Sequence, residues 1–141
     1  MRQIFQKQFG SADHLQVYQA PARVNIIGEH VDYLGGIVLP AAINYSIQAG
    51  IQSHPKNTYK LYSINYDSFW GTSEITKSDK HPWANYIMGV LDQLEARGIT
   101  VPGFELAFGG NIPPGSGLSS SAALEVVVAY ALNDYFNYGL S

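Results

Sequence analysis

The chain has 141 residues, a length that fits one domain or a large part of one. Its formal net charge is −3, so it lacks the basic excess that nucleic-acid-binding proteins use to neutralise phosphates. It contains no cysteine, which excludes disulfide bonds, thiolate metal sites and cysteine nucleophiles. No segment has the apolar length of a signal peptide or a membrane span, so we expect a cytoplasmic protein with no membrane partner.

The first half of the chain has the patterns of several strands, after an amphipathic lead-in at residues 1–12. Proline cannot donate to a sheet ladder, so Pro21 and Pro40 are expected to interrupt strands. We therefore expect strands over 15–20, 23–27 and 59–66, and two strand segments within 37–51 that are separated at Pro40.

The second half of the chain combines two helices with a strand. Residues 83–97 place apolar side chains on one helix face, and Gly98 is expected to end this helix in a left-handed conformation. A strand is expected over 104–108, followed by a loop rich in glycine and proline. The helix expected over 118–136 is apolar nearly all round, which is typical of a helix buried on more than one side. Together these elements predict a mixed α/β protein.

The loop before the last helix is rich in glycine and serine. The first turn of a helix has N–H groups without intrahelical partners, and the helix dipole adds positive charge, so such a loop suits a phosphate group. Gly115 and Gly117 allow close backbone approach, while Ser119, Ser120 and Ser121 offer hydroxyl groups. An ordinary helix capped by serine is the alternative. A Walker A loop is excluded because no Gly-Lys-Ser/Thr follows, and a Rossmann fingerprint is only half matched.

A second cluster of polar and ionisable side chains surrounds the end of the expected strand at 23–27. Glu29, His30 and Asp32 are suited to hydrogen bonds with vicinal sugar hydroxyls, and Arg23 could neutralise charge on a transferring phosphoryl group. One alternative is a solvated turn in which Arg23 pairs with an acidic neighbour. Another is a metal site formed by Glu29, His30 and Asp32, although their spacing is poor for a helical zinc site.

These two clusters together resemble the galactokinase family, within the GHMP group of small-molecule kinases. The segment A-R-V-N-I-I-G-E-H-V-D-Y at residues 22–33 resembles the galactokinase signature, with Ala22 in place of its opening glycine. The segment I-P-P-G-S-G-L-S-S-S-A-A at 112–123 is similar to the GHMP ATP-binding loop. Between them, W-A-N-Y-I-M-G-V at 83–90 resembles a helix of the family. The resemblance covers nearly the whole chain, and the signature at 22–33 is its most specific part.

The resemblance implies a role for each cluster. Glu29, His30 and Asp32 would bind galactose hydroxyls, and Arg23 would stabilise the phosphoryl group in the transition state. Trp83 would form a wall of the adenine pocket, with a plain core aromatic residue as an equal alternative. The ATP phosphates would be bound by Gly115, Ser116, Gly117, Leu118, Ser119, Ser120 and Ser121, with Ser120 or Ser121 near Mg²⁺.

The same resemblance implies a two-layer α/β sandwich with a mixed sheet packed against helices. Residues 1–141 would form the N-terminal GHMP kinase domain. Family members are longer and carry a catalytic acidic residue beyond the glycine-serine loop. We therefore expect the C-terminal domain to be missing and the isolated chain to be a poor catalyst that self-associates through its uncovered apolar faces.

The activity that the resemblance implies is ATP-dependent phosphorylation of galactose at the anomeric hydroxyl. Two alternatives keep the same fold. One is a kinase for a related sugar such as N-acetylgalactosamine or arabinose, and the other is a non-catalytic sensor that binds galactose and ATP.

Overall fold

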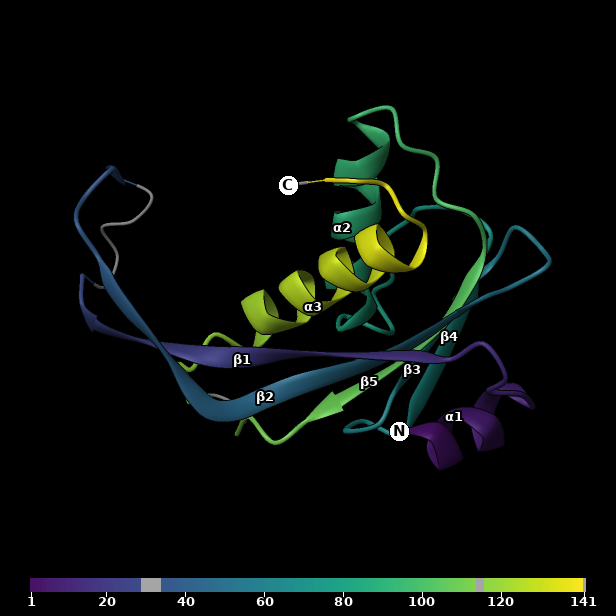
Figure 1. The fold of residues 1–141 in the computed structure, drawn as a ribbon, viewed down its shortest axis with the longest axis horizontal. Helices are drawn as coiled ribbons and strands as arrows, with labels where there is room; N and C mark the ends of the chain where they lie inside the picture. Colours follow the sequence, from purple (N-terminus) through teal and green to yellow (C-terminus); the bar gives the residue numbers. More distant parts are fainter. Residues whose placement is uncertain (29–33, 114–115, 141) are drawn as a thin grey trace.

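The computed structural model describes residues 1–28, 34–113 and 116–140. These residues form one five-stranded sheet with helices packed on it (Figure 1). Within the described ranges, none of the helices has the length and apolar character needed to cross a lipid bilayer. In chain order the elements are α1 (Arg2–Phe9), β1 (Gln16–Ile27), β2 (Leu39–Ser53), β3 (Tyr59–Ser63), β4 (Ser68–Thr72), α2 (Ala84–Glu95), β5 (Phe104–Gly110) and α3 (Ser120–Tyr135).

The sheet is mixed and has the strand order β1-β2-β5-β3-β4. Neighbouring strands are antiparallel except for β3 and β5, which run parallel. A parallel pair needs a crossover connection, and the chain between β3 and β5 supplies one that contains β4 and α2. Helices α2 and α3 cover one face of the sheet, whereas α1 lies against the other face through the buried Phe5 (Figure 1). The predicted two-layer α/β architecture is confirmed.

The last helix is buried on two sides, as its apolar pattern predicted. α3 packs against β1, β2 and α2, and it contributes Leu124, Val128 and Leu132 to the main core. Its third side faces solvent, where Val126 and Tyr130 are each 60% exposed. The observed helix spans Ser120–Tyr135, slightly inside the predicted range of 118–136.

The predicted strand breaks at Pro21 and Pro40 are wrong. β1 continues through Pro21 with a register shift between Pro21 and Arg23, and β2 includes Pro40 opposite Asn25. Both prolines occupy positions where a missing N–H costs little. β1 is an edge strand, and β2 pairs with β5 only from Ile47 onward, so its outer side is unpaired around Pro40.

The chain between β3 and α2 also differs from the prediction. β3 ends at Ser63 rather than at residue 66, and the short edge strand β4 was not predicted. Its sequence S-F-W-G-T carries too few residues to show a period, and glycine weakens a strand signal. The helix expected over 83–97 is confirmed as α2, and Gly98 has the expected positive φ of 77°.

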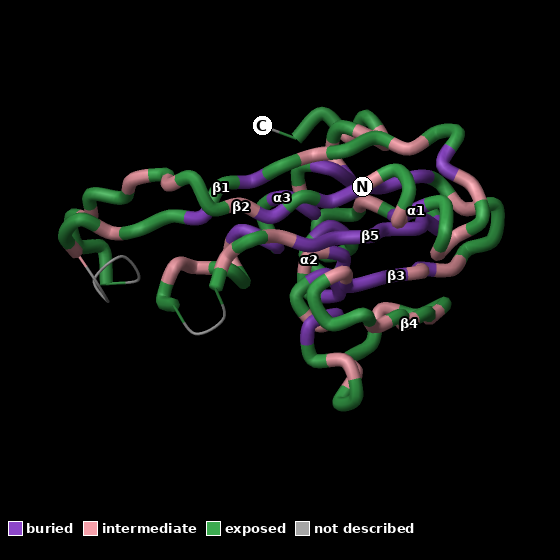
Figure 2. The backbone as a smooth tube through the Cα atoms, turned by 90° about the horizontal axis from the view of Figure 1, so that it is seen from below, coloured by how far each residue is buried: buried purple, intermediate pink, exposed green. Residues whose placement is uncertain are grey.

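The distal parts of β1 and β2 form a two-stranded arm that extends beyond the other strands (Figure 1). Figure 2 shows this arm as largely exposed, in contrast to the buried strands of the main sheet. Its exposed side chains are unusually apolar for a two-stranded hairpin, which has little stability of its own in water. They include Val24, Ile26, Ile27, Leu34, Ile37 and Leu39, which are between 37% and 92% exposed.

Candidate functional site

A cavity of about 310 Å³ lies where β3, β5 and the first turns of α2 and α3 meet. Its lining combines aromatic and aliphatic side chains with hydroxyl and amide groups, so the cavity offers contacts both for a flat ring and for polar substituents. Its lining residues are Ile47, Ser63, Asn65, Tyr66, Trp83, Tyr86, Phe108, Gly110, Ile112, Ser120, Ser121 and Leu124.

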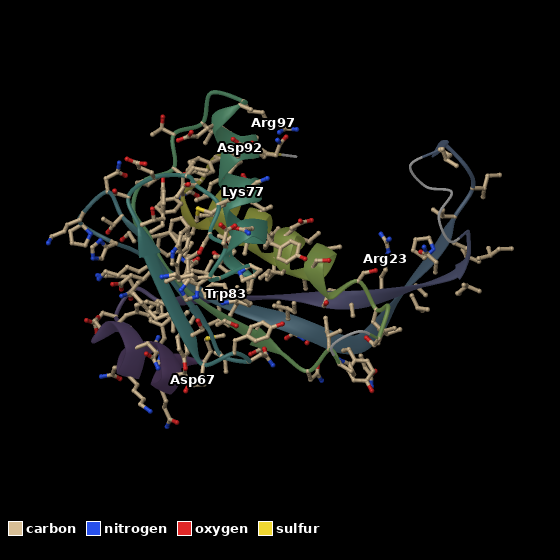
Figure 3. All side chains as sticks on the ribbon, turned by 180° about the vertical axis from the view of Figure 1, so that it is seen from behind. Arg23, Asp67, Lys77, Trp83, Asp92 and Arg97 are labelled. Atoms are coloured by element: carbon tan, nitrogen blue, oxygen red, sulfur yellow. The ribbon has the colours of Figure 1, made fainter. Side chains whose placement is uncertain are left out.

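Trp83 forms part of the apolar wall and also belongs to the core. It lies just before α2, is only 8% exposed, and packs with its ring centroid 5.5 Å from that of Phe108. On another side His81 packs edge-on, with a centroid separation of 5.9 Å. The two interpretations of Trp83 from the sequence are therefore compatible, because one ring both fills the core and lines the cavity. Figure 3 shows Trp83 in the body of the molecule, away from the arm.

Ser63 is a lining residue that the sequence did not reveal. It is fully buried at the end of β3, and its hydroxyl has no hydrogen-bond partner among the described residues. A buried hydroxyl without a partner is costly, so native proteins usually satisfy it with protein, water or ligand. Ser63 lies at the cavity wall, but its hydroxyl is closed off from solvent in this arrangement. Nothing in the strand sequence Y-K-L-Y-S distinguishes this serine from an ordinary strand end.

The polar end of the cavity is formed by the start of α3. Ser120 and Ser121 are exposed and line the cavity directly. Two residues just before the helix have positive φ, Gly117 at 70° and Ser119 at 57°. For serine this conformation is uncommon, and it turns the chain sharply into the helix. First-turn N–H groups of a helix lack intrahelical partners, so this end of the cavity favours an anion.

The structure gives no support to serine capping by Ser119. Ser119 occupies the N-cap position of α3, but its side chain makes no capping hydrogen bond. Ser116, Gly117 and Leu118 belong to the described chain and precede the helix, yet they are not among the residues that line the cavity. Gly115 lies outside the described residues.

The second predicted cluster is only partly described. Glu29, His30 and Asp32, the predicted sugar ligands and the members of the alternative metal site, lie outside the described residues. Arg23 is exposed on β1 opposite Ala42, and Figure 3 shows it on the arm, with its side chain on the side of α3. Across residues 1–28, 34–113 and 116–140, no group of three or more His, Asp or Glu side chains could hold a metal ion.

Ser46 connects the strand that carries Arg23 to the entrance of the glycine-serine loop. On one side Ser46 is the register partner of Pro21, two residues before Arg23. On the other side its N–H donates to Asn111 Oδ1 at 2.9 Å, and its carbonyl accepts from the Asn111 N–H at 3.3 Å. The base of the arm and the loop entrance therefore lie at the same end of the sheet, with only β2 between them.

Two family models match the chain. One is described as the galactokinase galactose-binding signature and matches residues 3–53, and the other is the GHMP kinases N terminal domain and matches residues 85–141. Similar curated proteins include the galactokinase of Bacillus subtilis (strain 168), which is 39% identical over 97% of this chain and 36% of the relative. The galactokinase of Thermosipho africanus (strain TCF52B) is 44% identical over 87% of this chain and 34% of the relative. The chain thus spans about a third of the length of the curated relatives it matches.

The fold is also similar to solved structures. The crystal structure of Lactococcus lactis galactokinase complexed with galactose matches with a TM-score of 0.91 at 36% identity, over 99% of this chain and 37% of that one. The mevalonate kinase of Methanococcus jannaschii matches with a TM-score of 0.75 at 20% identity, over 93% of this chain and 43% of that one. The second similarity, at such low identity, concerns the fold alone.

Proposed function

We propose, from the premise that this chain belongs to the galactokinase family of GHMP kinases, that it supplies the sugar-binding and nucleotide-binding parts of a cytoplasmic galactokinase. The reaction would transfer the γ-phosphoryl group of ATP to the anomeric hydroxyl of galactose. The observation that carries this proposal is the cavity in which an aromatic wall around Trp83 meets the serine-bearing start of α3.

The nucleotide fits the two halves of this cavity. An adenine ring would lie against the apolar wall formed by Trp83 and Phe108. The phosphates would lie at the start of α3, where unpaired N–H groups and the helix dipole favour negative charge. Mg²⁺ bound to the phosphates would neutralise their charge, and the hydroxyl groups of Ser120 and Ser121 are oxygen donors of the kind that it accepts. We therefore assign the phosphate-binding role to the loop from Gly115 to Ser121.

The sugar would bind at the end of β1. The match to the galactose-binding signature over residues 3–53 supports galactose as the ligand of Glu29, His30 and Asp32. In the transfer step the anomeric oxygen attacks the γ-phosphorus, the bond to the β,γ-bridging oxygen breaks, and ADP leaves. Arg23 lies on the strand that leads into this segment, where a guanidinium can stabilise charge on the transferring group.

We further propose that residues 1–141 are the N-terminal domain of a longer enzyme and that the base accepting the hydroxyl proton comes from its remainder. The relatives' greater length supports this, because the chain matches only 36% of the Bacillus subtilis galactokinase. The exposed apolar side chains of the arm and of α3 are surfaces that such additional polypeptide would cover. Without it, we expect these surfaces to make the 141-residue chain self-associate.

Calorimetric titration of the protein with galactose and with MgATP tests the proposal. Asp32→Ala should abolish galactose binding and leave MgATP binding unchanged, because only the sugar would contact this carboxylate. Ser121→Ala should weaken MgATP binding and spare galactose. Asp13→Ala is a control, because Asp13 is exposed and lies outside the cavity. Loss of both ligands in either site variant, or no binding of either ligand by the wild type, would contradict the proposal.

A further inference from the structure

The last residue of β5, Gly110, is held by a side chain rather than by a neighbouring strand on the side of β3. β3 pairs in parallel with β5 only as far as Ser63 opposite Phe108. Beyond this point the amide of Asn65 replaces the missing backbone. Its Nδ2 donates to the Gly110 carbonyl at 2.9 Å, and its Oδ1 accepts from the Gly110 N–H at 2.9 Å.

On the opposite side, β2 holds the same point of the chain. Gly110 is the register partner of Ile47, and Asn111 exchanges two hydrogen bonds with Ser46. The chain that leaves β5 toward the glycine-serine loop is therefore fixed from both sides, by Asn65 and by β2.

The two glycines that end β5 make this close packing possible. A Cβ atom at Gly110 would lie 2.2 Å from the Ser46 carbonyl oxygen, which is a backbone atom. A Cβ atom at Gly109 would lie 2.8 Å from Ile64 Cβ and 3.1 Å from Asn65 Oδ1. Larger residues would push β2 or the 64–65 turn away, so the absence of side chains here sets the position of the loop entrance.

We call this arrangement a bracket: one asparagine side chain donates to the carbonyl and accepts from the N–H of the same residue. Two further brackets occur among the described residues, and they allow a matched comparison. Asn133 brackets Leu140, with its Oδ1 accepting at 2.9 Å and its Nδ2 donating at 3.0 Å. Asn85 brackets Ser78 in the same way, at 2.8 Å and 3.2 Å. Of these three described brackets, only that of Asn65 joins residues that both line the cavity. The Asn133 bracket lies at the other end of α3 and outside the cavity.

We propose that Asn65 is a positioning residue that sets the place of the phosphate-binding loop relative to the aromatic wall. This inference rests on the proposed function, because it assumes that the loop binds the phosphates of ATP. By fixing Gly110, Asn65 ties the turn after β3 to the segment that carries Ile112 and leads to Ser120. On the β3 side, the separation between the base-binding and phosphate-binding parts of the cavity is therefore set by the Asn65 amide, while β2 holds the chain on the other side.

The test compares MgATP with adenosine, which has the same base but no phosphates. In Asn65→Ala, the dissociation constant of MgATP should rise about tenfold, as expected when two hydrogen bonds that order a binding loop are lost. The dissociation constant of adenosine, measured by NMR titration, should change less than about twofold. Asn133→Ala loses an equivalent bracket and should lower the melting temperature without changing either affinity. If Asn65→Ala does not fold, Asn65→Asp keeps the shape and the acceptor for the Gly110 N–H, and the same selective loss of MgATP is expected.

Two results would overturn the positioning role. Equal losses for MgATP and adenosine would make Asn65 a direct contact of the base, and unchanged affinity for both would show that the bracket serves stability alone. Failure of the wild-type protein to bind MgATP would reject the proposed function, and the positioning role with it. Binding of MgATP by the wild type together with either of the first two results would reject the positioning role only.

Discussion

Tyr18 donates a hydrogen bond of 2.8 Å to the Asp134 carboxylate and so ties the edge strand β1 to the last turn of α3. The Tyr18 ring also packs edge-on against Tyr130, with a centroid separation of 5.7 Å. We predict that Tyr18→Phe, which keeps the ring and loses the hydroxyl, lowers the free energy of unfolding by about 1 kcal/mol. Chemical denaturation at pH 8 measures this. No change in stability would show that the bond is lost to solvent competition.

The same contact predicts a change of stability at alkaline pH. Burial raises the pKa of Tyr18 above its ordinary value of 10.0. The hydrogen bond that Tyr18 donates to Asp134 and the negative charge of that carboxylate raise the pKa further. The neutral form is therefore favoured in the folded state, so the stabilisation is complete below pH 10 and is lost as the pH rises above it. The stability difference between wild type and Tyr18→Phe should stay constant up to about pH 10 and shrink above it, where tyrosine ionises in the unfolded chain. A difference that stays constant over this range would contradict the assignment.

The fold was largely predictable from the sequence, because the pattern of apolar residues in a long segment indicates whether that segment forms a helix or a strand. The apolar face of α2, the nearly all-apolar sequence of α3 and the hydrophobic run of β5 predicted the right elements. The errors occurred where the pairing of a strand with its neighbours determines whether the strand can contain a proline. Pro21 and Pro40 are tolerated because their N atoms face unpaired edges, which depends on strand order rather than on local sequence.

The candidate site was predicted in part. Ser120 and Ser121, which line the cavity, were candidates from the sequence because a glycine-rich loop before a helix is a local pattern. Asn65 and Ser63 were missed because their significance arises from contacts distant in sequence. Asn65 is separated from Gly110 by 45 residues, and Ser63 matters only because it is buried beside a cavity without a partner. Neither property leaves a trace in the spacing of residue types.

A buried charge on the α1 side of the sheet predicts a strong effect on stability. Glu105 is only 4% exposed, and its carboxylate accepts hydrogen bonds from Lys60 Nζ at 3.0 Å and Gln52 Nε2 at 2.8 Å. Lys60→Met removes the ammonium group and leaves only His54 Nε2, at 3.8 Å, and the Gln52 amide beside the carboxylate. We expect a loss of about 2 kcal/mol in the free energy of unfolding at pH 7.

The double variant Lys60→Met, Glu105→Met provides the control for this ion pair. It removes the unpaired carboxylate as well, so it should recover part of the lost stability. The recovery is incomplete because the buried Gln52 amide loses its 2.8 Å acceptor and keeps only the Ser11 carbonyl at 3.3 Å. Urea denaturation of the two variants and the wild type measures both effects. A double variant less stable than Lys60→Met would show that the pair itself is stabilising.

The exposed apolar surfaces predict concentration-dependent association of the 141-residue chain. Ile37 on the arm is 92% exposed, and Val126 on α3 is 60% exposed. Light scattering should show a mean mass above that of a monomer at high protein concentration. Ile37→Lys changes the arm and Val126→Lys changes α3, and each variant should lower this mean mass. The variant with the larger decrease identifies the surface that contributes more to association. A monodisperse wild-type monomer would contradict the expectation.

Two glycines predict opposite effects of the same substitution. Gly89 lies within α2 and has no atom within 4 Å of a Cβ built on it, so Gly89→Ala should raise the free energy of unfolding by about 0.5–1 kcal/mol.

In Gly110→Ala the new methyl group would lie 2.2 Å from the Ser46 carbonyl oxygen, which must move away from β5. We expect this variant to lose more than about 2 kcal/mol and to weaken MgATP binding as well, because Gly110 ends β5 just before the segment that leads to the phosphate-binding loop. Thermal denaturation with and without MgATP measures both consequences. If Gly110→Ala is destabilised but binds MgATP with full affinity, the close packing at Gly110 contributes to stability and does not determine where the loop lies.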